Sequence, residues 1–176
     1  MKSVSEQEWI KKAEGLAEWR KNRTSPPNLD LYKRIVSMVH VGLNVADIGA
    51  GQCHLFSCLQ ENDHVYYPFD PFPLNDGITR LCAEDFAEDF NEDDMGRYHT
   101  VFMLSALDNV VDLKLALKGL RNAATENIVI LTSIGVLPDP AHTVQVDRSD
   151  LVSVLGEPFQ EVEMLPKVFL FEWRVK

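Results

Sequence analysis

The chain has 176 residues, of which 45% are hydrophobic and 25% are charged, a composition typical of one globular domain. No apolar run approaches the roughly 20 residues of a membrane-spanning helix, and the charged N-terminus has no apolar stretch suited to a signal peptide. The three cysteines (Cys53, Cys58 and Cys82) cannot all pair with one another. We therefore expect a cytoplasmic protein with no membrane partner.

The formal net charge is −10, and it is unevenly distributed. Residues 1–40 carry eight basic and five acidic residues, whereas the remainder is strongly acidic. The overall acidity argues against broad, non-specific binding of nucleic acid. The basic N-terminal arm keeps nucleic acid as an alternative partner. It is not the favoured one, because a solvated amphipathic helix explains the same charges.

Helical spacing predicts two helices before residue 43. The first covers residues 5–23, with Ser5 as N-cap, and ends before the paired prolines Pro26 and Pro27. The second begins after Asn28 or Asp30 and runs through Val39. We expect residues 1–42 to form a helical segment that packs on a domain made of residues 43–176.

From residue 43 onward, predicted strands alternate with predicted helices. The strands cover residues 43–48, 65–69, 78–82, 100–104 and 128–131, and the helices cover 54–60, 112–123 and 149–155. Ser149 is the expected N-cap of the last helix, and Gly156 closes it. This alternation predicts a parallel sheet covered on both faces. Pro68 suits its strand only at an edge or a bulge.

Two further strands, residues 159–165 and 168–175, close the chain with only Pro166 and Lys167 between them. A connection this short cannot make a parallel crossover. The last strand is therefore expected to run antiparallel to its neighbour.

Polar and glycine residues follow the first strands at positions suited to a nucleoside ligand. Gly49 and Gly51 form a turn between a strand and a helix, which lets backbone approach a ligand closely or simply reverses the chain. Asp70 ends the second strand, 23 residues after Asp47, where a carboxylate can accept both ribose hydroxyls. An Asx turn before Pro71 is the alternative explanation.

Asp85 and Phe86 come after the third predicted strand, in the acidic run 84–94. A carboxylate and an aromatic ring there could contact the edge and the face of an adenine. A solvated acidic surface explains the same residues equally well.

Together these residues resemble the class I S-adenosylmethionine-dependent methyltransferases over nearly all of residues 43–176. Residues 45–51 match the first motif, Asp70 the ribose acid, and residues 105–110 the loop that lines the pocket under the methionine. The resemblance implies an α/β fold, a Rossmann-like three-layer sandwich with a mostly parallel seven-stranded sheet and an antiparallel last strand. It also implies S-adenosylmethionine as cofactor, bound by Asp47, Gly49, Ala50, Gly51, Asp70, Pro71, Phe72, Asp85, Phe86, Ser105 and Ala106.

The sequence departs from that family at several positions. Cys53 stands where members often have a third glycine, and Pro71 follows the ribose acid. His54 occupies the last glycine of a dinucleotide fingerprint, which argues against NAD. The Asn/Asp-Pro-Pro-aromatic motif is absent after the fourth strand, which argues against methylation of adenine N6 or glutamine.

Methyl transfer from a sulfonium needs positioning above all, so we expect no obligatory catalytic triad. Asp108 and Asn109 are candidates for contacts to the acceptor, or they cap the next helix. The loop 134–143, which contains His142, is expected to form a lid or a pocket wall. Cys53, His54 and Cys58 lack a second pair at metal-binding spacing, so no metal site is expected.

These patterns predict methyl transfer to an unidentified acceptor, with a small molecule or a protein favoured. One alternative is an RNA methyltransferase that uses the basic N-terminal arm. Another is a catalytically silent cofactor-binding domain that acts as a protein partner, with an acidic face at residues 84–94.

Overall fold

The computed structural model describes residues 29–59, 63–88, 97–138 and 142–175, together with single positions between residues 7 and 18. Most of the helix expected over residues 5–23 lies outside the described residues, although the described positions within it are helical. No helix in this described part of the chain is long and apolar enough to cross a membrane.

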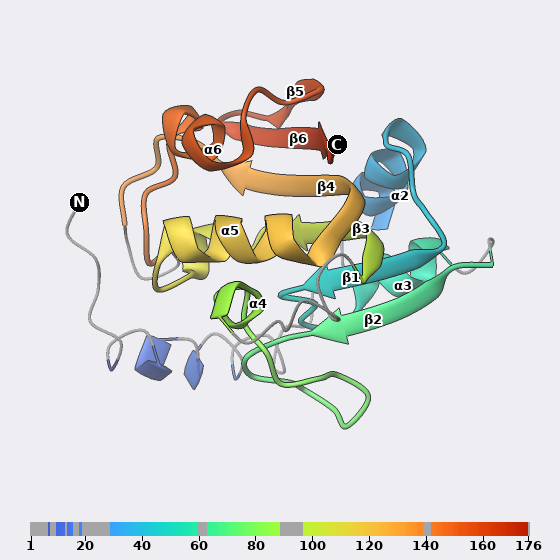
Figure 1. The fold of residues 1–176 in the computed structure, drawn as a ribbon. Coiled ribbons are helices and arrows are strands. Elements are labelled where there is room, and N and C mark those ends of the chain that lie inside the picture. Colours follow the sequence, from blue (N-terminus) through green and yellow to red (C-terminus); the bar gives the residue numbers. More distant parts are fainter. Residues whose placement is uncertain are drawn as a thin grey trace.

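A six-stranded sheet forms the centre of the protein (Figure 1). In chain order its strands are β1 (Asn44–Ile48), β2 (Val65–Phe69), β3 (Tyr98–Leu104), β4 (Ala124–Ser133), β5 (Gln160–Leu165) and β6 (Val168–Arg174). Across the sheet they lie in the order β2-β1-β3-β4-β6-β5. The pairs among β1 to β4 are parallel, and β6 runs antiparallel to both of its neighbours. The expected α/β class and the antiparallel last strand are therefore confirmed.

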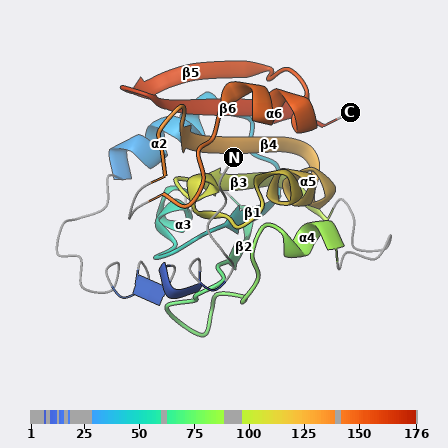
Figure 2. The same ribbon diagram turned by 90° about the vertical axis from the view of Figure 1, so that its left-hand side faces the viewer.

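Helices cover both faces of this sheet (Figure 2). The helices α2 (Leu29–Met38) and α3 (His54–Leu59) pack on one face, through buried residues such as Ile35 and Leu55. On the other face lie α4 (Asp85–Glu88), α5 (Leu113–Ala123) and α6 (Arg148–Leu155), where Phe86, Leu117 and Leu151 are fully buried. A 3-10 turn, η1 (Leu107–Asn109), follows β3. The result is the expected three-layer sandwich.

The strand expected over residues 78–82 does not form. Only Thr79 pairs with the sheet, through a single parallel bridge to Phe69. Beyond it the Cys82 N–H donates to Asp85 Oδ2 at 2.7 Å, which bends the chain into α4 and away from the sheet edge. The described sheet therefore has six strands and not seven, and β2 lies at its edge, where Pro68 is tolerated.

The N-cap of α6 also differs from the expected one. Asp147 and Asp150 form a capping box in which each side chain accepts from the other residue's backbone N–H. Ser149 lies inside the first turn, so the prediction that it is the N-cap was wrong. The helix ends at Gly156, which has φ 81°, as expected for a glycine that closes a helix.

Candidate functional site

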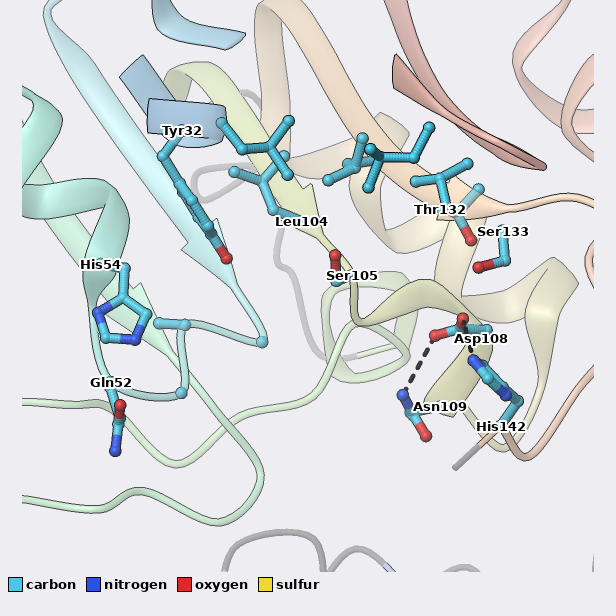
Figure 3. A pocket seen from close by; sticks show the side chains of 17 residues that line it. Tyr32, Gln52, His54, Leu104, Ser105, Asp108, Asn109, Thr132, Ser133 and His142 are labelled. Carbon is cyan, nitrogen blue, oxygen red and sulfur yellow. Dashed lines mark hydrogen bonds and ion pairs between the residues drawn. The ribbon is translucent and has the colours of Figure 1, made fainter. Parts of the chain in front are cut away.

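A pocket of about 410 Å³ opens at the carboxyl ends of the parallel strands. The strand order reverses between β1 and β3, because β1 leads to β2 on one side while β3 leads to β4 on the other. Ligands of open α/β sheets bind in the crevice at such a reversal. The lining residues are Leu31, Tyr32, Gly49, Ala50, Gly51, Gln52, His54, Leu104, Ser105, Asp108, Asn109, Leu131, Thr132, Ser133, His142, Leu165 and Val168 (Figure 3).

The glycine loop after β1 forms one wall of this pocket. Gly49 and Gly51 have φ values of 79° and 54°, in the left-handed region that favours glycine. A Cβ added to Gly49 would lie 2.5 Å from Ala106 Cβ, so the loop and the start of η1 touch here only because residue 49 has no side chain. Cys53 has φ 56°, so this cysteine also adopts the left-handed conformation that favours glycine.

The segment after β3 forms the opposite wall. Ser105 is exposed and has φ 56°, an uncommon conformation for a residue with a side chain. Asp108 is only 7% exposed, and its Oδ1 accepts a 3.1 Å hydrogen bond from Asn109 Nδ2. Its Oδ2 lies 3.4 Å from His142 Nε2. Ser105, Asp108 and Asn109 therefore reach the pocket, whereas Ala106 packs beneath Gly49.

Asp47 lies under the glycine loop and does not line the pocket. The residue is 4% exposed, and its Oδ2 accepts a 2.6 Å hydrogen bond from the Tyr66 hydroxyl. Burial raises the pKa of Asp47 to about 7; the bond from Tyr66 acts in the opposite direction, and the nearby Asp70 carboxylate adds to the increase. Asp47 is thus a buried acid that supports the loop from below.

Asp70 joins the glycine loop to the loop after β2. The residue is 2% exposed, and its Oδ2 accepts from the Gly51 N–H at 3.0 Å and its Oδ1 from the Phe72 N–H at 2.8 Å. The second bond is the Asx turn that was the alternative explanation. Asp70, Pro71 and Phe72 do not line the pocket. Ribose binding by Asp70 stays a prediction.

Asp85 and Phe86 lie away from the pocket as well. The Asp85 carboxylate caps the start of α4 through the Cys82 N–H. Phe86 is fully buried, and its ring packs against Phe69 with the ring centroids 5.1 Å apart. Stacking of Phe86 on an adenine is not what the structure shows, because α5 and the sheet enclose the ring in the core.

Several residues that line the pocket were not predicted from the sequence. Tyr32 of α2 contacts His54 edge to face, with the ring centroids 6.2 Å apart. Thr132 is 1% exposed, and its Oγ1 has no hydrogen-bond partner. The apolar pattern of β4 indicated only a buried strand, and no residue in it marks where that strand leaves the core. Across the described residues, no group of three or more His, Cys, Asp or Glu side chains could hold a metal ion.

This chain resembles known proteins in its structure. No protein-family model matches the sequence, and no curated protein matches it. A Burkholderia thailandensis 1,6-didemethyltoxoflavin N1-methyltransferase, solved with its substrate and S-adenosylhomocysteine, aligns with a TM-score of 0.71 at 10% identity, covering 100% of this chain and 92% of its own. The Synechocystis magnesium protoporphyrin IX methyltransferase, solved with S-adenosylmethionine, has a TM-score of 0.66 at 14% identity and full coverage of both chains.

The fold is that of the class I S-adenosylmethionine-dependent methyltransferases. A Rhodobacter sphaeroides protein described as a Zn-dependent alcohol dehydrogenase also aligns, with a TM-score of 0.68 at 13% identity, covering 93% of this chain and 97% of its own. At such identities the likeness establishes the fold alone.

The methyltransferase cofactor fits one half of this site. The glycine loop and Ser105 offer close backbone approach and polar contacts for a methionine group. The adenosine half fits less well, because the Asp70 carboxylate is buried and engaged by backbone N–H groups. The pocket therefore supports the methionine end of the cofactor more directly than its nucleoside end.

Proposed function

We propose that this chain binds S-adenosylmethionine in the pocket at the strand-order reversal and transfers its methyl group to an acceptor. The observation that carries the proposal is the meeting of the glycine loop and the post-β3 loop around one pocket, in a methyltransferase fold. Two solved proteins of the same fold, both named as methyltransferases, were solved with the cofactor or its product bound. A cytoplasmic location is part of this proposal.

The protein's own part in such a reaction is to bind and orient. The cofactor supplies a methyl group already activated on a sulfonium. The Gly49–Gly51 loop and Ser105 would hold its methionine part, and Asp108 and Asn109 would face the acceptor. Holding two reactants in line supplies much of the rate in a one-step displacement. The favoured acceptors are a small molecule or a protein.

Calorimetry with S-adenosylhomocysteine tests the binding step. Ala50 lines the pocket, so Ala50→Leu fills space that the ligand needs and should weaken binding at least tenfold. Ala87→Leu adds the same volume at a half-buried position of α4 that does not line the pocket, and should bind like the parent protein. A parent protein that binds no S-adenosylhomocysteine would contradict the proposal.

Radiolabelled S-adenosylmethionine and fractionated cell extract separate the candidate acceptors. Label in small molecules or in protein supports the favoured acceptors. Label in RNA, with salt-dependent RNA binding that disappears when residues 1–26 are removed, would support the RNA alternative. Binding of the cofactor with no label in any fraction would indicate the catalytically silent domain.

A further inference from the structure

Figure 3 shows polar side chains on two sides of the pocket, with Gln52 and His54 on one side and Asp108, Asn109 and His142 on the other. The apolar part of the pocket contains Leu104 from β3, Leu131 from β4 and Val168 from β6. The larger group of polar side chains gathers at one end, around the tip of β4 and η1. This polar end consists of Asp108, Asn109, Thr132, Ser133 and His142. A ligand that fills the apolar part and this polar end therefore needs an apolar body and a polar group.

The His142–Asp108 pair at the polar end is held in place by backbone contacts. The Asp108 carbonyl accepts hydrogen bonds from the backbone N–H groups of Thr143 and Val144, at 2.7 and 3.1 Å, and from Thr143 Oγ1 at 3.0 Å. Lys12 Nζ donates to the His142 carbonyl at 2.8 Å. These contacts hold the backbone of both residues, and His142 Nε2 lies 3.4 Å from Asp108 Oδ2. Such support from surrounding bonds is what a reactive pair needs to keep its geometry.

Thr132 gives an independent sign that a ligand binds at the same end. Its hydroxyl is buried without a hydrogen-bond partner, although the residue lines the pocket. Buried polar groups are almost always bonded, because an unbonded one costs free energy. A polar group of a bound molecule would satisfy this hydroxyl.

We propose that the polar end is the acceptor subsite and that it takes a hydroxyl group carried on an apolar or aromatic small molecule, with His142 as general base. This proposal rests on the proposed methyl transfer. The hydroxyl oxygen forms a bond to the methyl carbon, while the carbon–sulfur bond breaks and its electron pair stays on sulfur, leaving a neutral thioether. The hydroxyl proton passes to the His142 imidazole, and Asp108 stabilises the imidazolium. Thr132 orients the acceptor oxygen.

The pair of His142 and Asp108 favours a hydroxyl over an amine. A neutral hydroxyl is a weak nucleophile, so removing its proton during the transfer lowers the barrier substantially. A neutral amine attacks through its own lone pair and loses a proton afterwards, so it gains little from a positioned base. The apolar part of the pocket then binds the body of the acceptor.

The test uses 4-nitrophenol, with 4-nitroanisole as the matched compound that lacks the hydroxyl. We expect the full chain to bind 4-nitrophenol more tightly than 4-nitroanisole. The bound phenol should also show phenolate absorbance at a pH where the free phenol is protonated, with or without S-adenosylhomocysteine. Equal binding of the two compounds, or binding of neither, would overturn the proposal.

Variants assign the roles of the three side chains. His142→Gln should abolish the phenolate band and, with S-adenosylmethionine present, lower kcat for nitroanisole formation by about 100-fold while KM changes little. Asp108→Asn should reduce the band. Thr132→Val should weaken 4-nitrophenol binding about fivefold, whereas Thr132→Ser, which keeps the hydroxyl, should not.

His40→Gln is the matched control, because His40 is an exposed histidine whose Nε2 lies 3.6 Å from Glu126 Oε2, and it does not line the pocket. It should behave like the parent protein. A phenolate band that survives in His142→Gln would overturn the assignment of the base. Calorimetry with S-adenosylhomocysteine on the same variants separates the two proposals. Failure of the parent to bind S-adenosylhomocysteine contradicts methyl transfer, whereas normal binding without phenolate formation contradicts only the acceptor subsite.

Discussion

The two halves of the crevice at the strand-order reversal use their polar residues in opposite ways. On the β3 side, Ser105, Asp108 and Asn109 line an open pocket. On the β2 side, the carboxylates of Asp47 and Asp70 are buried and accept hydrogen bonds from the protein itself. We call these the open half and the closed half.

The difference shows that an acid at the end of a strand can serve the loop as well as a ligand. Asp70 satisfies the backbone N–H groups of Gly51 and Phe72, which would otherwise be left without partners near a tight turn. Asp47 is neutralised in part by its burial. The closed half therefore holds the glycine loop in the shape that the open half displays to the pocket.

The largest expected effect concerns Asp47 and pH. Its folded pKa is about 7, against an ordinary value of 3.8, so the folded protein keeps this proton over a pH range in which the unfolded chain has released it. Stability from this group is present below about pH 4 and is lost as the pH rises toward 7, by up to about 4 kcal/mol. Urea unfolding of the parent and of Asp47→Asn across this range measures the effect.

Other carboxylates add their own pH dependence, so the difference between parent and variant is the informative quantity. Asp47→Asn cannot titrate and still accepts the Tyr66 hydrogen bond. Its stability relative to the parent should therefore rise with pH. A constant difference between the two proteins would mean that Asp47 is ionised throughout and that the closed half is more polar than its burial indicates.

Asp70→Ala should lower the free energy of unfolding by about 3 kcal/mol. It removes a buried carboxylate that accepts two hydrogen bonds, and two backbone N–H groups lose their acceptor. Thermal and urea unfolding measure this loss. Asp76→Ala, at an exposed position in the same loop region, should change stability by less than about 0.5 kcal/mol. If Asp70→Ala were as stable as the parent but unable to bind S-adenosylhomocysteine, Asp70 would belong to the ligand site and not to the closed half.

Gly49→Ala tests the contact between the two halves. The new Cβ would be strained by φ 79° and would lie 2.5 Å from Ala106 Cβ, so we expect a loss of about 2 to 3 kcal/mol. Gly156→Ala is the matched control: its φ is 81°, but nothing lies within 4 Å of the added Cβ. It should cost only the backbone strain, about 1 kcal/mol. Equal losses at both positions in urea unfolding would show that Ala106 moves aside freely.

The sequence predicted the open half better than the closed half. The glycine turn and the antiparallel hairpin follow from local patterns of glycine, apolar residues and chain length between strands, and the pocket-lining loop after β3 was expected from the family resemblance. The burial of Asp70 and Phe86 depends on packing between segments that are distant in the chain, which no local pattern encodes. The expected strand over residues 78–82 failed for a similar reason, because the Asp85 cap on Cys82 competes with further pairing to β2.

Glu84 shows the same limit on the other face of the sheet. Its Oε1 accepts from the backbone N–H groups of Val111 and Asp112, at 2.8 and 3.3 Å, and so anchors the start of α5. In the sequence it is one acid of a long acidic run, which favoured a solvated surface. Only the fold identifies Glu84 as a buried anchor.

Thr132→Val tests whether the buried hydroxyl in the open half serves a ligand or the fold. If the open half is shaped for a ligand, removing an unpartnered hydroxyl should stabilise the protein without ligand, by about 1 kcal/mol. A polar residue kept for folding would instead lose stability on the same change. Urea unfolding of the parent, Thr132→Val and Thr132→Ser decides between these signs, and a destabilised Thr132→Val would place this hydroxyl with the structural groups of the closed half.

Substitutions at Cys53 have an equally small expected effect, and they measure the backbone strain in the glycine loop. The residue has φ 56°, which costs a residue with a Cβ about 1 kcal/mol relative to glycine. Cys53→Gly and Cys53→Ala both remove the sulfur, but only the alanine keeps the strained Cβ. Cys53→Gly should therefore be about 1 kcal/mol more stable than Cys53→Ala in urea unfolding. If the alanine variant were the more stable, the left-handed conformation at residue 53 would relax when the thiol is removed, and the side chain rather than the loop would set the backbone there.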